Sequence, residues 1–265
     1  MFLSKKVVGS CVLLLVLAFA VTVAAQPPAP LLQVYRINVK SGSQAQFAEY
    51  LMKIAEAANK TNAPQGWTTT RGVLGTSGTD YFVFLPSQTW GERDGWSQVP
   101  QMLTEAFGEA EAQKILAKGG NASWGSETTL FTLDAERTLH ADRSTEANYY
   151  QILLGQVKPE MVQEYNSVVG TLMEAQKKAG TQQQWIRRTS RLGKSWLFYA
   201  AVPFDKWGEW DNANTNFWAN VAKAVGEDEA RHLQGRLVAC YEEREIFVIQ
   251  RIPELSRAAP GSSSN

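Results

Sequence analysis

Residues 106–116 read AFGEAEAQKIL, and residues 224–234 read AVGEDEARHLQ. The two segments lie 118 residues apart, and the same offset carries Trp67 onto Trp185. Similarity at a fixed offset indicates that one structural unit occurs more than once in a chain. The sequence therefore predicts that the chain contains two copies of the same structural unit.

The first unit, residues 31–133, begins with a segment that alternates between apolar and polar side chains, which predicts a strand over residues 31–40. The next segment carries an apolar stripe at helical spacing, formed by Phe47, Leu51, Ile54 and Ala58. The remaining predicted elements are strands over 67–74 and 81–85, a helical region over 99–118 with a break at Gly108, and a strand over 127–133. The strand over 81–85 is apolar on both faces, so it is expected to be central and covered on both sides.

The second unit, residues 148–250, repeats this order after a linker over residues 134–147. Its predicted elements are a strand over 149–157, a helix over 159–179, strands over 185–192 and 196–202, a helix over 215–234 and a strand over 237–249. Strand, helix, strand, strand, helix, strand is the ferredoxin-like order, and such a unit covers only one face of its sheet with helices. We therefore predict an α+β fold in which two ferredoxin-like βαββαβ repeats pack sheet to sheet as a barrel, a pseudo-dimer within one chain.

The chain ends carry different signals. Lys5 and Lys6, an apolar run and then small residues up to Ala25 are typical of a cleaved signal peptide over residues 1–25, which predicts export to the periplasm or medium. The apolar run is shorter than the roughly 20 residues of a membrane span, so no stable membrane insertion is expected after cleavage. Residues 256–265 are expected to form a disordered tail.

Charge and cysteine content exclude several classes of protein. Signal removal takes 2 of the 26 basic side chains and none of the 26 acidic ones, so the mature chain has no basic excess with which to bind nucleic acid. Cys240 is then the sole cysteine, and an intrachain disulfide is impossible. With 2 histidines, zinc-type spacing is absent, so we expect no metal and no cofactor.

The order of elements, with Trp90 and Trp207 after the third strand of each unit, resembles the dimeric α/β-barrel superfamily. Antibiotic-biosynthesis monooxygenases, haem-degrading monooxygenases and NIPSNAP-like proteins belong to it. The resemblance implies that two ferredoxin-like units, usually supplied by two chains, are fused here as a tandem duplication. A fold shared by oxygenases, isomerases and proteins without catalytic activity does not by itself select a function.

The haem-degrading members use an Asn on the first strand, a Trp at the start of the second helix and a His further along that helix. Asn38 and Trp96 match the first two in unit one, where no His follows. Unit two has His232 but carries Gln156 where the strand Asn would stand. Neither unit holds the full set.

The candidate ligand-binding residues are Asn38, Trp67, Arg71, Trp185 and Arg187. An indole that packs a flat apolar ligand beside an Arg that meets its oxygen would form a pocket between sheet and helices. The alternative is that both Trp residues pack the barrel ends and the Arg side chains reach solvent. The Trp-rich segments 90–96 and 207–218 are interpreted as loops that cover the barrel ends, and Cys240 as an inert thiol on a strand.

From these residues we expect an exported protein that binds a small, largely apolar or aromatic molecule in a barrel-type pocket. One alternative is a cofactor-independent monooxygenase or isomerase of the same superfamily, and another is a structural or interaction module without catalytic activity. A functional site should lie where one unit alone brings polar groups together, because positions alike in both units most simply serve the fold.

Overall fold

The computed structural model describes residues 29–261, without the side chains of residues 210–215. The expected signal peptide over residues 1–25 lies outside these residues. Within them, no helix combines the length and the apolar character that a membrane crossing requires.

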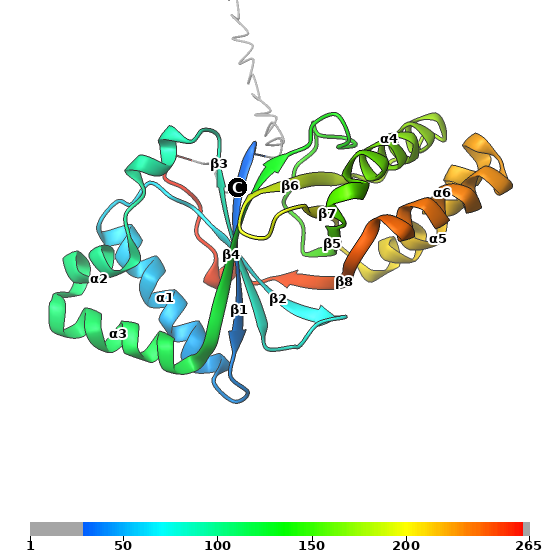
Figure 1. Ribbon diagram of the computed structural model, residues 1–265. Coiled ribbons are helices and arrows are strands. Elements are labelled where there is room, and N and C mark those ends of the chain that lie inside the picture. The colour runs from blue at the N-terminus through cyan, green and yellow to red at the C-terminus, as the bar shows by residue number, and fades with distance from the viewer. Residues whose placement is uncertain (1–28, 262–265) are drawn as a thin grey trace, which may run out of the picture.

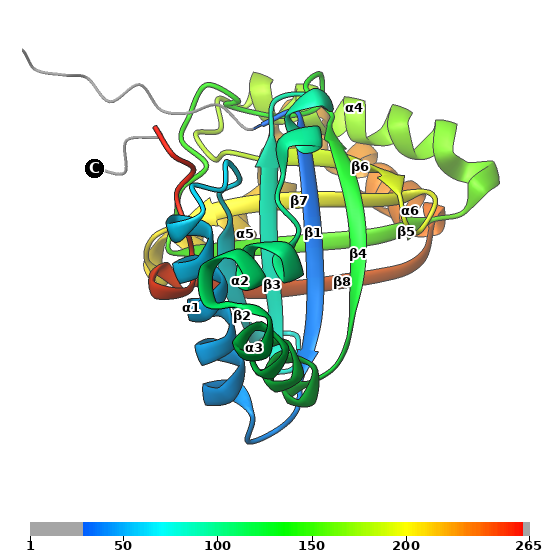
Figure 2. The ribbon, with the colours of Figure 1, turned by 90° about the vertical axis from the view of Figure 1, so that its left-hand side faces the viewer.

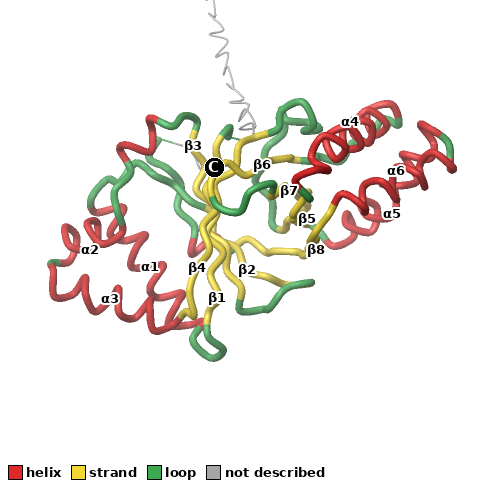
Figure 3. The backbone as a smooth tube through the Cα atoms, in the orientation of Figure 1, coloured by secondary structure: helices red, strands yellow, loops and turns green. Residues whose placement is uncertain are grey.

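Eight strands form a closed antiparallel barrel, with helices packed against the outside of its wall on two opposite sides (Figures 1 and 3). The first half contains β1 (Leu31–Val39), α1 (Gln44–Lys60), β2 (Thr68–Leu74), β3 (Asp80–Ser87), a 3-10 turn (Gly91–Gly95), α2 (Val99–Phe107), α3 (Glu109–Ala122) and β4 (Ser123–Leu133). The second half contains β5 (Tyr149–Val157), a 3-10 turn (Pro159–Met161), α4 (Val162–Lys178), β6 (Ile186–Leu192), β7 (Leu197–Phe204), α5 (Trp207–Val225), α6 (Glu227–Cys240), β8 (Tyr241–Arg251) and a final 3-10 turn (Pro253–Leu255).

The barrel is assembled from two four-stranded sheets. The order around it is β1-β3-β2-β8-β5-β7-β6-β4, so β2 pairs with β8 and β4 pairs with β6 where the two halves meet. Figure 2 shows β1, β3 and β4 crossing over the strands of the second half. The predicted face-to-face meeting of two sheets is thus present, and paired edges close it into a barrel.

Strand alternation divides the core into three clusters. Alternate residues of each strand face the barrel lumen, and the residues between them face the helices. One cluster lies under α1–α3 around Phe47 and Tyr81, and a second lies under α4–α6 around Tyr165 and Phe198. The third fills the middle of the lumen with ten buried side chains: Leu32, Phe82, Phe131, Ile152, Ile186, Leu197, Tyr199, Ala201, Phe247 and Ile249.

Three local predictions were wrong. Residues 237–240 end helix α6 instead of starting a strand, and Cys240 is its last residue. Trp207 begins helix α5, which continues to Val225, so the segment 207–218 is helical and not a loop. The expected tail over residues 256–265 was wrong at its start, because Arg257 is buried. Residues 262–265 lie outside the described residues.

Gly75, at the end of β2, is a point where the two halves touch backbone to backbone. Its φ is +72°, and a Cβ there would lie 2.5 Å from the carbonyl oxygen of Ile246 and 3.1 Å from Cα of Phe247. We expect Gly75→Ala to lower the free energy of unfolding by about 3 kcal/mol, since it combines left-handed strain with a backbone clash. Urea denaturation checks this value. Gly42→Ala is the matched control, because Gly42 also has positive φ but a Cβ there would meet nothing within 4 Å.

Gly42→Ala should cost about 1 kcal/mol from strain alone. Equal losses in the two variants would contradict a close approach of the halves at this seam.

Candidate functional site

A cavity of about 160 Å³ lies between the second sheet and helices α4–α6. Its apolar wall includes Leu172 and Met173 from α4, Ala200 from β7 and Phe217 from α5. Leu172 and Met173 belong to the buried stripe that α4 presents to the sheet, and Ala200 leaves room because its side chain is one carbon long. An apolar cavity of about 150 Å³ accommodates a benzene ring, so this one fits a single aromatic ring.

Trp185 and Arg187 bring polar atoms to this cavity, because both lie on the helix-facing side of the same strand segment. The indole Nε1 of Trp185 is buried and has no hydrogen-bond partner within the described part of the chain. Arg187 is 6% exposed, and its Nε is equally without a partner there. A buried donor without an acceptor costs about 1 to 3 kcal/mol, so an oxygen atom of a ligand that reached these groups would be stabilised.

One tyrosine holds the guanidinium of Arg187, and a second tyrosine packs against the first. Its Nη2 donates to Tyr165 Oη at 2.5 Å, and the ring of Tyr165 lies edge-on to Tyr241 with centroids 5.6 Å apart. Burial raises the pKa of Tyr241, so its hydroxyl stays neutral. No described carboxylate forms an ion pair with Arg187. Its positive charge therefore remains available to an acceptor oxygen or a phenolate.

In the first half, the polar groups at the equivalent positions already form hydrogen bonds within the protein. Trp67, which lies 118 residues before Trp185, donates from Nε1 to the carbonyl of Leu255 at 2.9 Å. Thr69, which lies 118 residues before Arg187, donates to the same carbonyl at 2.7 Å. The second half has the longer, charged side chain of Arg187 and leaves its indole N–H unpaired. Of these two corresponding places in the described chain, the one in the second half leaves an indole N–H and an arginine Nε unpaired.

The five residues suggested by the sequence do not form one site. Trp185 and Arg187 line the same cavity, whereas Trp67 is buried beneath the final 3-10 turn. Arg71 is exposed and reaches Gln250 at 3.5 Å, and Asn38 is exposed near the end of β1.

Other residues singled out by the sequence lie away from this cavity. His232 is exposed on α6 and does not line it, and no group of three or more metal-ligating side chains occurs among residues 29–261 that are described. Cys240 is buried and its Sγ donates to the carbonyl of Arg236 at 3.2 Å. Burial raises the pKa of this thiol, which keeps it protonated and unreactive.

Sequence reasoning missed the aromatic groups that shape the cavity. Phe217 packs against Trp185 with ring centroids 4.9 Å apart, and Trp218 also lines the cavity. Both residues lie where the helix predicted over 215–234 overlaps the segment 207–218 that was interpreted as a loop. Val221 follows Phe217 by four residues and Ala222 follows Trp218 by four, and this helical spacing was the signal that the segment belongs to a buried helix.

Comparison with known proteins finds solved structures with a similar fold, but no protein family that matches the sequence. No family model and no curated protein matches the chain. Among solved structures, an anthrone oxidase-like protein aligns with a TM-score of 0.54 at 13% identity, covering 84% of this chain and 91% of that one. A candidate monooxygenase from Lactobacillus acidophilus NCFM aligns with a TM-score of 0.50 at 11% identity, covering 84% and 94%.

A variant chlorite dismutase from Candidatus Nitrospira defluvii also has a TM-score of 0.50, at 6% identity, covering 85% of this chain and 93% of that one. Proteins with different named activities thus share this architecture, and at such low identity the likeness concerns the fold alone. The chain has the fold of the dimeric α/β-barrel proteins.

Proposed function

We propose that the protein binds a small aromatic molecule with an acceptor oxygen in the cavity under α4–α6. The observation that carries the proposal is the pair of buried, unpartnered N–H groups of Trp185 and Arg187 in a ring-sized apolar cavity. The ring would pack among apolar walls while the oxygen accepts from these donors. We further propose that the chain is exported after signal-peptide cleavage and that its two halves arose by tandem duplication.

The probes that test this are acetophenone, a ring with a carbonyl oxygen, and toluene, the same ring without one. Isothermal titration calorimetry should show acetophenone binding about tenfold more tightly, since satisfying a buried donor contributes 1 to 3 kcal/mol and about 1.4 kcal/mol corresponds to tenfold. Equal affinities for the two probes would contradict the assigned role of the unpaired donors.

Trp185→Phe removes one of these donors and keeps an aromatic ring in place. We expect it to weaken acetophenone binding about fivefold to tenfold and to leave toluene binding within about twofold. Trp67→Phe is the matched control, because it removes the same indole N–H where that group already donates to Leu255. The control should leave both affinities unchanged, and parallel losses in the two variants would overturn the assignment.

A cofactor-independent monooxygenase acting in the same cavity is a second candidate. It is favoured by the unpaired charge of Arg187, which suits a phenolate, and by the names of two structural neighbours. An oxygen electrode tests it with resorcinol as the electron-rich phenol. Oxygen uptake that depends on Arg187 supports catalysis, whereas binding without uptake leaves ligand carriage as the function.

A further inference from the structure

A second cavity lies inside the barrel itself, on the other face of the second sheet. It has a volume of about 190 Å³ and lies at the end of the lumen where β1 begins and β8 ends. Leu32, Phe84, Ile186 and Ala201 provide an apolar floor. The cavity exceeds the roughly 150 Å³ that holds a benzene ring, so a substituted ring fits.

Arg188 places a positive charge in this cavity. It follows Arg187 directly on β6, and strand alternation turns the two side chains to opposite faces of the sheet. Arg188 is 4% exposed, its Nη1 has no hydrogen-bond partner among residues 29–261 as described, and it takes part in no ion pair there. Burial lowers the pKa of Arg188 to about 10, so the guanidinium still carries its charge at neutral pH. A buried charge without a counter-ion is rare in a folded protein.

The groups that face Arg188 do not neutralise it. Tyr199 is buried opposite it, and burial raises the pKa of that phenol, so it stays uncharged. The hydroxyl of Tyr150 donates to the carbonyl of Thr145 at 2.8 Å and its pKa is also raised by burial. Glu146 is the acidic residue at this end, and its side chain is 74% exposed.

Arg251 adds a second guanidinium to the same cavity. Its Nη1 lies 3.6 Å from Glu146, while its Nε is buried without a partner in the described chain. Two cations thus line the cavity against one largely solvated carboxylate. The cavity carries an excess positive charge that its own residues do not balance.

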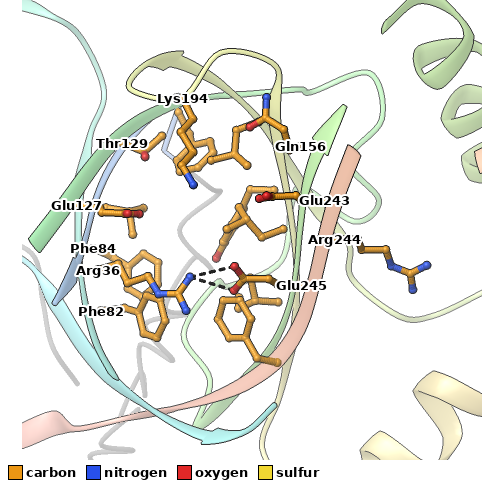
Figure 4. A pocket seen from close by; sticks show the side chains of 17 residues that line it. Arg36, Phe82, Phe84, Glu127, Thr129, Gln156, Lys194, Glu243, Arg244 and Glu245 are labelled. Atoms are coloured by element: carbon orange, nitrogen blue, oxygen red, sulfur yellow. Dashed lines mark hydrogen bonds and ion pairs between the residues drawn. The ribbon is translucent and has the colours of Figure 1, made fainter. Parts of the chain in front are cut away.

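At the opposite end of the lumen, an arginine is paired with carboxylates of the protein. There a cavity of about 80 Å³ contains Arg36, which lies 2.9 Å from Glu245 (Figure 4). Arg36 also lies 3.4 Å from Asp80. Figure 4 also shows Glu127 and Glu243 on the walls of that cavity, and Arg244 pointing away from it. The arginine at one end of the barrel is paired within the protein, and the arginine at the other end is not.

We propose that the end of the lumen around Arg188 binds a small aromatic carboxylate, with its carboxylate on Arg188 and Arg251 and its ring on the apolar floor. A planar carboxylate accepts two parallel hydrogen bonds from one guanidinium, which satisfies the unpaired N–H groups and the charge together. The site is separate from the cavity under α4–α6, because the sheet lies between them.

Benzoate and its neutral analogue benzamide are the probes, and calorimetry on the purified protein is the measurement. Benzoate should bind about tenfold or more tightly than benzamide, because hydrogen bonds between ionised partners are about twice as strong as neutral ones. Arg188→Met should abolish this preference and weaken benzoate binding more than about tenfold. Equal binding of the two probes to the unmodified protein would overturn the proposal.

Arg71→Met is the matched control, the same substitution at an exposed arginine that lines neither cavity. It should leave benzoate affinity within about twofold, because the control side chain does not line the lumen cavity. If Arg187→Met abolishes benzoate binding and Arg188→Met does not, the anion occupies the cavity under α4–α6 and the proposal is wrong. Ala201→Leu fills the lumen cavity while retaining Arg188, and it should also abolish the preference for benzoate over benzamide.

Discussion

Arg188→Met is expected to raise the free energy of unfolding by about 2 to 3 kcal/mol at pH 7. Arg188 is 4% exposed and its pKa is lowered to about 10 from an ordinary value of 12.5, which means that the fold disfavours its charged form. Met has a similar length and no charge, so it keeps most of the packing and removes the desolvation cost. Urea denaturation measures the change, with an unaltered m-value as the sign that both chains unfold from comparable states.

The increase in the free energy of unfolding caused by Arg188→Met should become smaller at high pH. Between pH 10 and 12.5 the unfolded chain keeps the proton on Arg188 while the folded chain releases it, so the stability of the unmodified protein rises relative to the variant. Tyr199 and Tyr150 face the same cavity, together with Glu146 and Arg251, and burial raises the pKa of both tyrosines. In the unmodified chain the charge of Arg188 partly offsets this rise for Tyr199. Destabilisation by Arg188→Met at pH 7 would show that the guanidinium has a structural partner and would contradict an unpaired charge.

A stabilising substitution at a buried position identifies a residue that is retained for a reason other than stability. Proteins keep such costly groups mainly where a ligand or a reaction needs them. Arg188→Met should therefore separate two properties that change together at an ordinary core position: stability increases while benzoate binding is lost. A variant that lost both would place Arg188 in the scaffold.

The arrangement of strands was predictable because it depends on period-two alternation and on a segment that occurs twice. The strands over 31–40, 149–157 and 185–192 occur as β1, β5 and β6 with shifts of at most one residue. The error over residues 237–240 arose because a short apolar run fits a strand and a buried helix equally well. Ala230, Leu233 and Cys240 in fact lie on one buried face of α6.

The site was predictable only in part. Trp185 and Arg187 are two residues apart on one predicted strand, so their side chains were expected on the same face of the sheet. This spacing was the reason for predicting that they lie together. Their unpaired state depends on what α4 and α5 leave open, which is a property of packing and not of local sequence. Arg188 was not predicted as a site residue because it is adjacent to Arg187 and faces the other side of the sheet. A charged side chain is also not expected inside the lumen of a barrel, since such residues are mostly exposed.

Arg257 is the buried arginine for which the same substitution should have the opposite effect. Its Nε donates to Asn59 Oδ1 at 2.8 Å, its Nη1 to the carbonyl of Gln65 at 2.5 Å and its Nη2 to the carbonyl of Ala58 at 3.2 Å. Its backbone pairs with Trp67, with N···O distances of 2.8 Å in both directions. Each nitrogen of this guanidinium therefore has an acceptor, and each acceptor belongs to the end of α1 or the segment that follows it.

Arg257→Met should lower the free energy of unfolding by about 3 kcal/mol, because it leaves the buried acceptors without their charged donor. The measurement is the same urea denaturation used for Arg188→Met. Both variants replace a buried arginine by methionine, and the two arginines differ in whether their guanidinium groups are hydrogen-bonded. Arg71→Met, at an exposed position with one long contact, should change stability by less than about 0.5 kcal/mol. If Arg188→Met and Arg257→Met shift stability in the same direction, pairing does not distinguish these two arginines, and the lumen site loses its physical basis.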